Sequence, residues 1–312
     1  SAGNVLYDEL TVAKGGVLLV RPYDGLKGLG QLHIHANVIT VAEGGLISAV
    51  GAGFRGKDAM DGEAQSMSSG GGTMSTTMGW PGGGGAYAGD GAPGLVALCT
   101  SVASVGGKSF FDPLKPLGLG SAGGAANVMG APASRGGNGG GFIVLEAAKI
   151  VIDGTVDVSG AAPPALGGVA PGGGSGGAIF LHTANLSGTG LLRARGGDAP
   201  HGGGDLAGPI EPNNGGAGSG GVIKILGPQR PASLAIDLAG GESGDCGAGH
   251  HGGDGIDASD VMANGCVDAD GDKSVSKACG GTDCDDSDAL VNPAGTEACN
   301  GVDDNCDGNV DE

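Results

Sequence analysis

Apolar and polar residues alternate along several segments of this chain, and the alternation returns at a fixed offset. The segment from Gly140 to Gly160 contains apolar residues and glycines that recur 36 positions further on. The matched positions are Ile143/Ile179, Leu145/Leu181, Ala148/Ala184, Ile150/Leu186, Gly154/Gly190, Val156/Leu192, Val158/Ala194 and Gly160/Gly196. Alternation with a period of two predicts β-strands, and the fixed offset predicts one structural unit used repeatedly.

Two further copies extend this pattern in both directions. One begins at Gly221, where Ile223 and Ile225 take the places of Ile179 and Leu181. An earlier copy, two residues longer in its middle, runs through Leu32, Ile34, Ile39, Val41, Gly45, Ile47, Ala49 and Gly51. Each copy predicts a strand, a short corner, a strand, a glycine corner and a strand. Successive copies would stack and share a narrow core, which is the architecture of a solenoid.

The offset also aligns charged residues on the outside of the predicted coils. Asp157 and Arg193 occupy equivalent positions in successive copies. We therefore expect an ion pair between them, worth about 0.5 kcal/mol if it is exposed. The strand-and-corner pattern resembles the right-handed parallel β-helix over roughly residues 4–51 and 140–230.

The composition explains what lies between the strands. The chain has 73 glycines and only 3% aromatic residues, which disfavours both helix and a wide aromatic core. A long insertion rich in Gly, Ser, Met and Pro occupies residues 52–139. Its glycine runs resemble the polyglycine-type sandwiches of certain phage adhesins and of glycine-rich receptor domains, where neighbouring backbones approach too closely for a Cβ atom. Partly mobile surface loops are the alternative interpretation.

The charge divides the chain into a nearly neutral body and an acidic tail. Residues 242–312 carry 18 acidic and two basic residues, so their net charge is −16, whereas the rest contributes −3 to the total of −19. This distribution argues against nucleic acid as a partner, which needs basic surface, and favours hard cations. We expect a solenoid body at 1–241, a linker at 242–265 and a calcium-binding segment at 266–312.

The spacing of acidic residues in the tail is typical of calcium loops. Asp303, Asn305, Asp307, Gly308 and Asp311 stand at positions 1, 3, 5, 6 and 9 of an EF-hand-like loop, with Gly permitting the sharp turn. A second loop has Asp286, Asp288 and Glu297 at positions 1, 3 and 12, although Leu290 departs from the pattern at position 5. A third cluster consists of Asp268, Asp270 and Asp272.

The segment from Asp268 to Glu312 closely resembles the MopE-type metal-binding motif of secreted bacterial proteins and is similar to thrombospondin type 3 calcium repeats. The resemblance rests on DADGD, DCDD and NPAGTEACNGVDDNCDGNVDE in this sequence. It implies a ligand set that adds Asp283 and Asp285 to Asp268, Asp270, Asp272, Asp286, Asp288, Glu297, Asp303, Asn305, Asp307 and Asp311. Members of this group are sometimes linked to copper, but carboxylate and amide oxygens favour Ca²⁺.

The cysteines indicate an oxidising compartment. Six of the seven lie in or beside the tail, where no CxxC pair suggests zinc, and they are candidates for disulfides: Cys246, Cys266, Cys279, Cys284, Cys299 and Cys306. Six cysteines allow 15 pairings, which the sequence leaves open. Cys99 is then a buried thiol or a partner of Cys246. The chain starts at Ser1 and not at Met, so we expect a mature, exported protein. No run of 18 apolar residues is present, so we expect no transmembrane segment. The MopE resemblance implies a bacterial source.

Two alternative chemistries depend on residues of the body. His33 and His35 project from one face of a predicted strand and could ligate a transition metal, but a solvent-exposed pair is the simpler interpretation because no third ligand is visible nearby. His250 and His251, just upstream of the acidic segment, keep copper binding open as a further alternative. A carbohydrate-active enzyme would need clustered carboxylates on the solenoid. Its only candidates on the repeats are the charged residues Asp153, Asp157, Arg193 and Arg195.

The sequence therefore predicts an all-β protein: a glycine-rich parallel β-solenoid with long polyglycine-like loops, and a small irregular C-terminal segment stabilised by disulfides and calcium. We expect a non-enzymatic structural or adhesive protein of the cell surface or extracellular matrix. Its expected partners are calcium ions, further copies of the chain in filaments or arrays, and surface glycans. The N-terminal apolar segment Val17–Val20 could add as a strand to a neighbouring subunit.

Overall fold

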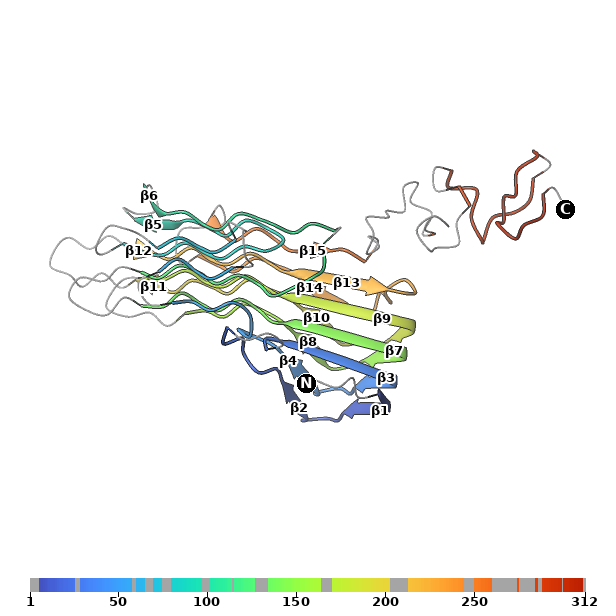
Figure 1. Ribbon diagram of the computed structural model, residues 1–312, viewed down its shortest axis with the longest axis horizontal. Coiled ribbons are helices and arrows are strands. Elements are labelled where there is room, and N and C mark those ends of the chain that lie inside the picture. The colour runs from blue at the N-terminus through green and yellow to red at the C-terminus, as the bar shows by residue number, and fades with distance from the viewer. Residues whose placement is uncertain are drawn as a thin grey trace. The chain divides into compact units, whose positions relative to one another are not determined.

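The computed structural model describes most of the chain, and its strands are drawn in Figure 1. The described residues are 6–25, 29–57, 60–64, 70–74, 80–96, 101–113, 115–126, 134–163, 170–202, 213–243, 250–259, 274, 284–285, 288–298 and 300–310. They form two compact units. The first, called the body here, comprises Ser1–Phe111 and Leu117–Asp257, and the second comprises Asp112–Pro116 and Ala258–Glu312. The domain boundaries expected at residues 241 and 265 stay a prediction.

The body contains two parallel sheets. The first has the order β1-β3-β7-β9-β13-β15 and consists of Leu6–Val12, Gln31–Val41, Phe142–Ile152, Ala178–Ser187, Val222–Leu226 and Ile256–Asp257. The second has the order β14-β10-β8-β4-β2 and consists of Ala235–Asp237, Leu191–Arg193, Thr155–Asp157, Leu46–Ser48 and Val17–Leu19. Within the described residues there is no α-helix. The same residues therefore contain no helix that is long and apolar enough to cross a membrane.

The predicted register between successive coils is confirmed. In the first sheet Ile143 pairs with Ile179, and Leu145 with Leu181. The next coil continues the column with Ile225 opposite Leu181, and the earlier coil places Ile34 opposite Leu145. All-parallel, in-register stacking of this kind is compatible with a solenoid.

Side chains from both sheets form one buried apolar cluster. Leu145 and Leu181 from the first sheet and Ile47, Val156 and Leu192 from the second are all fully inaccessible to solvent. Because each strand alternates inward and outward residues, its inward side chains form columns across the sheet, and Ile143, Leu145 and Ile150 each belong to a different buried column. The core is therefore narrow, as the repeat pattern predicts.

The short corner expected within each coil is wrong for the coils of β3, β7 and β9, where one continuous strand takes its place, as the 11 residues from Phe142 to Ile152 show. The inward positions change phase at Ala148 and Lys149, which are both exposed, and Ile150 then resumes the buried column. The same shift occurs at Ala184 in β9. The sequence shows the change of phase, but the chain accommodates it without turning.

The expected glycine corner is present and stacks from coil to coil. A Cβ atom added to Gly154 would lie 2.3 Å from the carbonyl oxygen of Gly45, and one added to Gly190 would lie 2.1 Å from that of Gly154. These carbonyls also accept hydrogen bonds from the following strand of the next coil, as in Leu191 N–H to Gly154 O at 2.9 Å. Only glycine allows the corners to approach this closely.

The expected ion pair between coils is confirmed. Arg193 stands directly opposite Asp157 in the second sheet, and their Nη1 and Oδ2 atoms are 3.6 Å apart. The next coil adds Asp237, whose Oδ2 atom accepts a hydrogen bond from Arg193 Nε at 3.1 Å. One arginine therefore bridges the carboxylates of two flanking coils.

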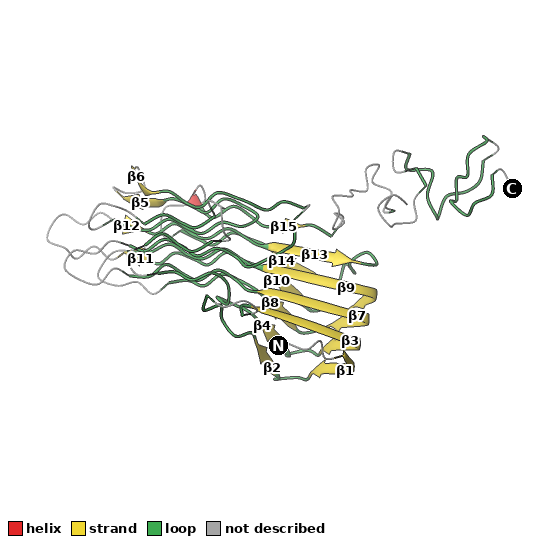
Figure 2. Ribbon diagram, in the orientation of Figure 1, coloured by secondary structure: helices red, strands yellow, loops and turns green. Residues whose placement is uncertain are grey.

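The glycine-rich runs extend from the strands and lie side by side, as Figure 2 shows. Their N–H groups donate in rotation to three neighbouring runs. In the run that starts at Gly172, for example, the N–H groups of Gly172 and Ser175 donate to the carbonyl oxygens of Gly124 and Ser121, which belong to one neighbouring run. The other donors in this stretch follow the same three-residue period: Gly173 and Gly176 bond to Gly216 and Ser219, and Gly174 and Gly177 bond to Ala161 and Val158.

This three-residue rotation is the hydrogen-bonding pattern of a polyglycine-type helix surrounded by similar helices. The run that begins at Gly82 behaves in the same way, since Gly82 and Gly85 donate to Ala170 and Gly173. We call these interlocked runs the glycine lattice. Several described parts of the insertion at 52–139, among them Gly82–Gly85 and Ser121–Gly124, belong to it, which supports the polyglycine-type packing over mobile loops for these runs.

A small antiparallel sheet of order β11-β12-β5-β6 lies within the same unit. It consists of His201–Gly202, Asn213–Asn214, Gly94–Val96 and Ser101–Ser104. Its pairing connects β5 of the insertion with β12 of a later coil, where Asn214 stands opposite Leu95. The insertion is thus joined to the repeats by the strand pairing of this sheet as well as by the hydrogen bonds of the lattice.

The lattice makes a direct prediction for glycine substitutions. A Cβ atom on Gly84 would lie 1.8 Å from the carbonyl oxygen of Ala217, so Gly84→Ala should lower the free energy of unfolding by at least about 3 kcal/mol. Gly15→Ala is the control, because no atom lies within 4 Å of its added Cβ and only its φ of 74° opposes the change. That substitution should cost about 1 to 2 kcal/mol. Denaturant unfolding would compare them, and equal losses would contradict the lattice.

Candidate metal centre

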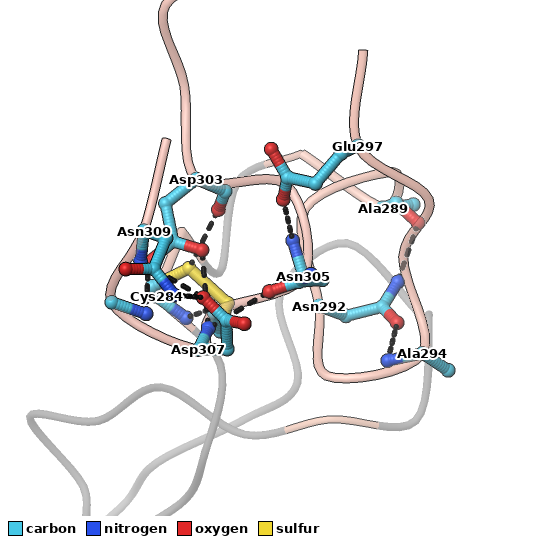
Figure 3. Close-up of a disulfide and its surroundings, with 11 residues drawn as sticks. Cys284, Ala289, Asn292, Ala294, Glu297, Asp303, Asn305, Asp307 and Asn309 are labelled. Atoms are coloured by element: carbon cyan, nitrogen blue, oxygen red, sulfur yellow. Dashed lines mark hydrogen bonds between the residues drawn. A yellow bond between two sulfur atoms is a disulfide. The ribbon is translucent and has the colours of Figure 1, made fainter. Parts of the chain in front are cut away.

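The C-terminal unit is held together by a disulfide. Cys284 and Cys306 are bonded with a separation of 22 residues along the chain, and Figure 3 shows the loop that this bond closes. Both were candidates from the sequence, and the structure pairs them. In the chain-entropy model, closing a loop of this length disfavours the unfolded state by roughly 3 kcal/mol. The other candidates, Cys246, Cys266, Cys279 and Cys299, and also Cys99, lie outside the described residues.

The loop that begins at Asp303 is folded around its own carboxylates. Asp303 Oδ1 accepts the Asp307 N–H at 3.1 Å, and its Oδ2 accepts the Gly308 N–H at 2.9 Å. The Asn305 side-chain oxygen accepts the same Asp307 N–H at 3.0 Å. Asp307 Oδ1 in turn accepts the Asn309 N–H at 2.8 Å (Figure 3). The oxygens at loop positions 1, 3 and 5 therefore lie on one tight turn.

The glycine at position 6 of this loop has the conformation expected for a sharp turn. Gly308 has a φ of 99°, where an L-amino acid side chain is strained. Cys306 is the one non-glycine residue with positive φ among the described residues, at 60°. It directly precedes Asp307, so the disulfide is anchored inside the same turn that presents the position 5 carboxylate.

Glu297 lies beside this loop. Its Oε1 atom accepts the Asn305 N–H at 2.8 Å, which connects it to the turn formed by Asp303 and Asp307. The sequence places Glu297 at position 12 of the preceding loop, together with Asp286 and Asp288. Asp288 Oδ1 accepts the Leu290 N–H at 3.1 Å, which begins that second turn. The assignment of Glu297 to the second loop stays a prediction.

Asp304 is an acidic residue that the sequence did not single out. It is only 5% exposed and accepts hydrogen bonds from the Ala298 N–H at 2.9 Å and the Asn300 side-chain amide at 3.1 Å. Its main-chain oxygen accepts the Asn292 N–H. Asp304 therefore connects the turn at Asp303 with the preceding segment from the inside. In the sequence, it is marked by its position directly after Asp303, the position 1 aspartate.

Part of the expected ligand set lies outside the described residues: Asp268, Asp270, Asp272, Asp283, Asp286 and Asp311. The described members are Asp285, Asp288, Glu297, Asp303, Asn305 and Asp307. Within the described residues, no three His, Cys, Asp or Glu side chains are placed together to hold a metal ion. The loop at 303–307 has two of these side chains and an amide, and its predicted fourth donor is Asp311.

The donor chemistry of the described tail fits a hard cation. Its candidate ligands are carboxylate and amide oxygens, and its two described cysteines are consumed by the disulfide. Oxygen-rich sites of this kind suit Ca²⁺ or Mg²⁺ better than copper, which prefers imidazole or thiolate.

A different group of side chains meets on the outer face of the first sheet. His33 and His35 of β3 are about half exposed, as expected for the outward positions of a strand. Glu146 of β7 joins them, because its Oε2 atom lies 2.7 Å from His33 Nε2 and 3.6 Å from His35 Nδ1. His182 of β9 approaches from the other side, with Nδ1 3.9 Å from Glu146 Oε1.

Glu146 and His182 were missed in the sequence, although the repeat alignment contains them. The register that pairs Ile34 with Leu145 also pairs His35 with Glu146, and the offset of 36 takes Glu146 to His182. Following polar as well as apolar positions through the alignment would have revealed the cluster. His250 and His251 lie elsewhere in the chain and are not part of it.

The charged residues considered for an enzyme have structural partners. Asp157 and Arg193 form the ion pair between coils, and Arg195 Nε lies 3.8 Å from Oδ1 of Asp237, which also pairs with Arg193. Asp153 Oδ1 accepts the Thr189 N–H at 3.0 Å at the corner of the next coil. These contacts account for the side chains as parts of the coil stack.

Comparison with known proteins supports the C-terminal assignment. A family model named Cu-binding MopE and described as "Putative metal-binding motif" matches residues 283–312. No curated protein and no solved structure matches the chain. The segment from residue 283 to 312 thus carries a metal-binding motif of this type, and its described part is the disulfide-closed loop with the Asp303 turn.

Proposed function

We propose that this chain is a secreted, calcium-binding, non-enzymatic structural protein of the bacterial surface or extracellular matrix. The observation that carries the proposal is the turn at Asp303, Asn305 and Asp307, whose oxygens are gathered by the chain's own N–H groups. A family model for a metal-binding motif covers the same residues. The lattice supports the structural part, because a body held by backbone hydrogen bonds is suited to bearing load.

Calcium is the proposed ion because of charge and donor type. The 16 net negative charges of residues 242–312 repel one another until cations offset them. Each described candidate ligand offers oxygen, which favours Ca²⁺. The name of the matched family points to copper, which is the competing identity for the ion.

Calcium should order the tail and protect it from proteolysis. An ion present at 100 times its dissociation constant stabilises the folded form by about 2.7 kcal/mol. We expect the tail to be cleaved rapidly with a chelator and slowly with Ca²⁺. The double variant Asp303→Asn/Asp307→Asn should bind Ca²⁺ at least about tenfold more weakly, because two charged ligands are lost. Calorimetric titration with Ca²⁺ and limited proteolysis would measure both effects.

The control for this experiment removes two carboxylates from the body. Asp8 and Glu43 are exposed there, and Asp8→Asn/Glu43→Gln should bind Ca²⁺ like the unaltered chain. Equal protease resistance with chelator and with Ca²⁺ would contradict the proposal. Tighter binding of Cu²⁺ than of Ca²⁺ at a site that requires Asp303 would replace calcium by copper.

Self-assembly is proposed through the open ends of the two parallel sheets. β2 is the last strand of its sheet, and its Val17 and Leu19 are 58% and 68% exposed. An edge strand with exposed apolar side chains is a template for pairing with another chain. The opposite edge of that sheet is β14, so one chain could add to the next in a head-to-tail manner.

We expect filaments or higher oligomers in electron micrographs and sedimentation profiles when Ca²⁺ is present. The variant Val17→Lys/Leu19→Lys should abolish them, since edge lysines oppose strand addition. The control is Val102→Lys/Val105→Lys, because these valines are comparably exposed, at 60% and 55%, and lie in and directly after β6, the edge strand of the separate antiparallel sheet. A chain that stays monomeric at high concentration, or whose assembly is lost only in the control, would refute this interface.

A further inference from the structure

The outer face of the first sheet carries a cluster of one carboxylate and three imidazoles that the proposed function does not use. His35, Glu146 and His182 stand directly opposite one another on β3, β7 and β9. His33 lies two residues before His35, so it projects from the same face. The four side chains thus come from three adjacent strands, and the three imidazoles converge on the Glu146 carboxylate.

We propose that His33, His35, Glu146 and His182 bind one transition-metal dication of the Zn²⁺ or Cu²⁺ class. Imidazole nitrogen together with one carboxylate is a donor set that these ions prefer, whereas Ca²⁺ and Mg²⁺ prefer oxygen alone. The Glu146 carboxylate also offsets one of the two positive charges of the ion, and the three imidazoles bind as neutral ligands. This site is separate from the acidic loops of the tail.

The backbone beneath the cluster is fixed in place. The residues that alternate with the proposed ligands point inward, and Ile34, Leu145 and Leu181 are at most 4% exposed. Neighbouring strands are about 4.8 Å apart, so the Cα atoms of His35 and His182 are separated by roughly 10 Å with Glu146 midway. Two imidazoles that lean toward the middle strand can then reach one ion above the carboxylate.

Each imidazole nitrogen lies near the Glu146 carboxylate, at a separation that can be compared with the spacing of two ligands on one ion. Zinc lies about 2.0 to 2.1 Å from each nitrogen or oxygen ligand, so two ligand atoms of a tetrahedral site are about 3.3 Å apart. The three imidazole nitrogens are 2.7, 3.6 and 3.9 Å from the Glu146 oxygens. Each of these separations needs to change by less than about 1 Å for both atoms to contact one ion.

The cluster is not a preformed metal cage, because within the described residues no such group of three ligands is already in place. The carboxylate instead lies against the imidazoles, with His33 at hydrogen-bond distance. Ion binding replaces that contact by two bonds to the metal. The histidine side chains are 51%, 58% and 53% exposed, so their rings can rotate without disturbing the core.

Calorimetric titration of the full chain with ZnCl₂, and separately with CuCl₂, tests the site. Excess Ca²⁺ is added to the buffer to compete for the oxygen ligands of the tail. The titration is repeated with the Asp303→Asn/Asp307→Asn variant, in which the proposed tail site is weakened. We expect one ion per chain in both backgrounds. His35→Gln and His182→Gln should each weaken binding at least about tenfold, the lower bound for losing an outer ligand. The electron paramagnetic resonance spectrum of bound Cu²⁺ should show nitrogen coupling.

His182→Gln is the decisive variant. A simple chelate formed by His33 and His35 on one strand would survive this change, whereas a site that spans three strands would not. His250→Gln/His251→Gln is the matched control and should bind like the unaltered chain. The proposal is overturned if neither ion binds at one per chain, if His182→Gln leaves affinity unchanged, or if the control loses it. Unchanged thermal unfolding of the metal-free variants would show that their sheet is intact.

Discussion

Successive N–H groups of the glycine runs donate in three directions, and the rest of the body depends on this rotation. Each run must have neighbours on several sides at backbone distance, as when Gly172, Gly173 and Gly174 donate to three different runs. A Cβ atom has no room at the glycine positions of this arrangement: one on Gly177 would lie 1.9 Å from the carbonyl oxygen of Gly141. Within the lattice, backbone hydrogen bonds therefore do the work that apolar side chains do between the two sheets.

The lattice and the strands stabilise each other because glycine runs continue directly into strands along the chain. The hydrogen bonds of the run at Gly172–Gly177 pass without interruption into those of β9, where Ala178 donates to Gly141 just before β7. A lattice run that shifted along its neighbour would also shift the strand that follows it. The buried column of Leu145 and Leu181 fixes that strand, since a slip of one residue would turn its apolar side chains outward.

The strands could be predicted because their side chains report the register. Leu145 opposite Leu181 and Asp157 opposite Arg193 both follow from the offset of 36. The neighbours of each glycine run could not be predicted, because a residue without a side chain leaves no pattern from which a partner can be identified. The continuous strand through Ala148 was likewise hidden, since a change of phase in the apolar pattern is equally consistent with a corner and with an irregular strand.

In the tail the limits of sequence reasoning were different. The spacing of Asp303, Asn305 and Asp307 indicated the turn correctly, because each side chain acts on main-chain groups only two to five residues away. The partners Cys284 and Cys306, and the contact of Glu297 with Asn305, join positions that only the folded loop brings together. Local geometry was therefore readable from the sequence, and pairings across the loop were not.

A glycine lattice restricts where this protein can carry chemistry. At its glycine positions the backbone is in contact with backbone, so a side chain there would separate the runs, as the Cβ position on Gly84 illustrates. The side chains that it does hold, such as those of Ser175 and Ser219, are small, buried and hydrogen-bonded to the backbone of neighbouring runs. The candidate ligands named above instead lie on the outer faces of the strands and in the segments beyond the lattice. The proposed sites follow this division: nitrogen ligands on the rigid face of β3, β7 and β9, and oxygen ligands in the tail. Because the two donor types prefer different ions, one chain can bind two classes of cation without competition between them.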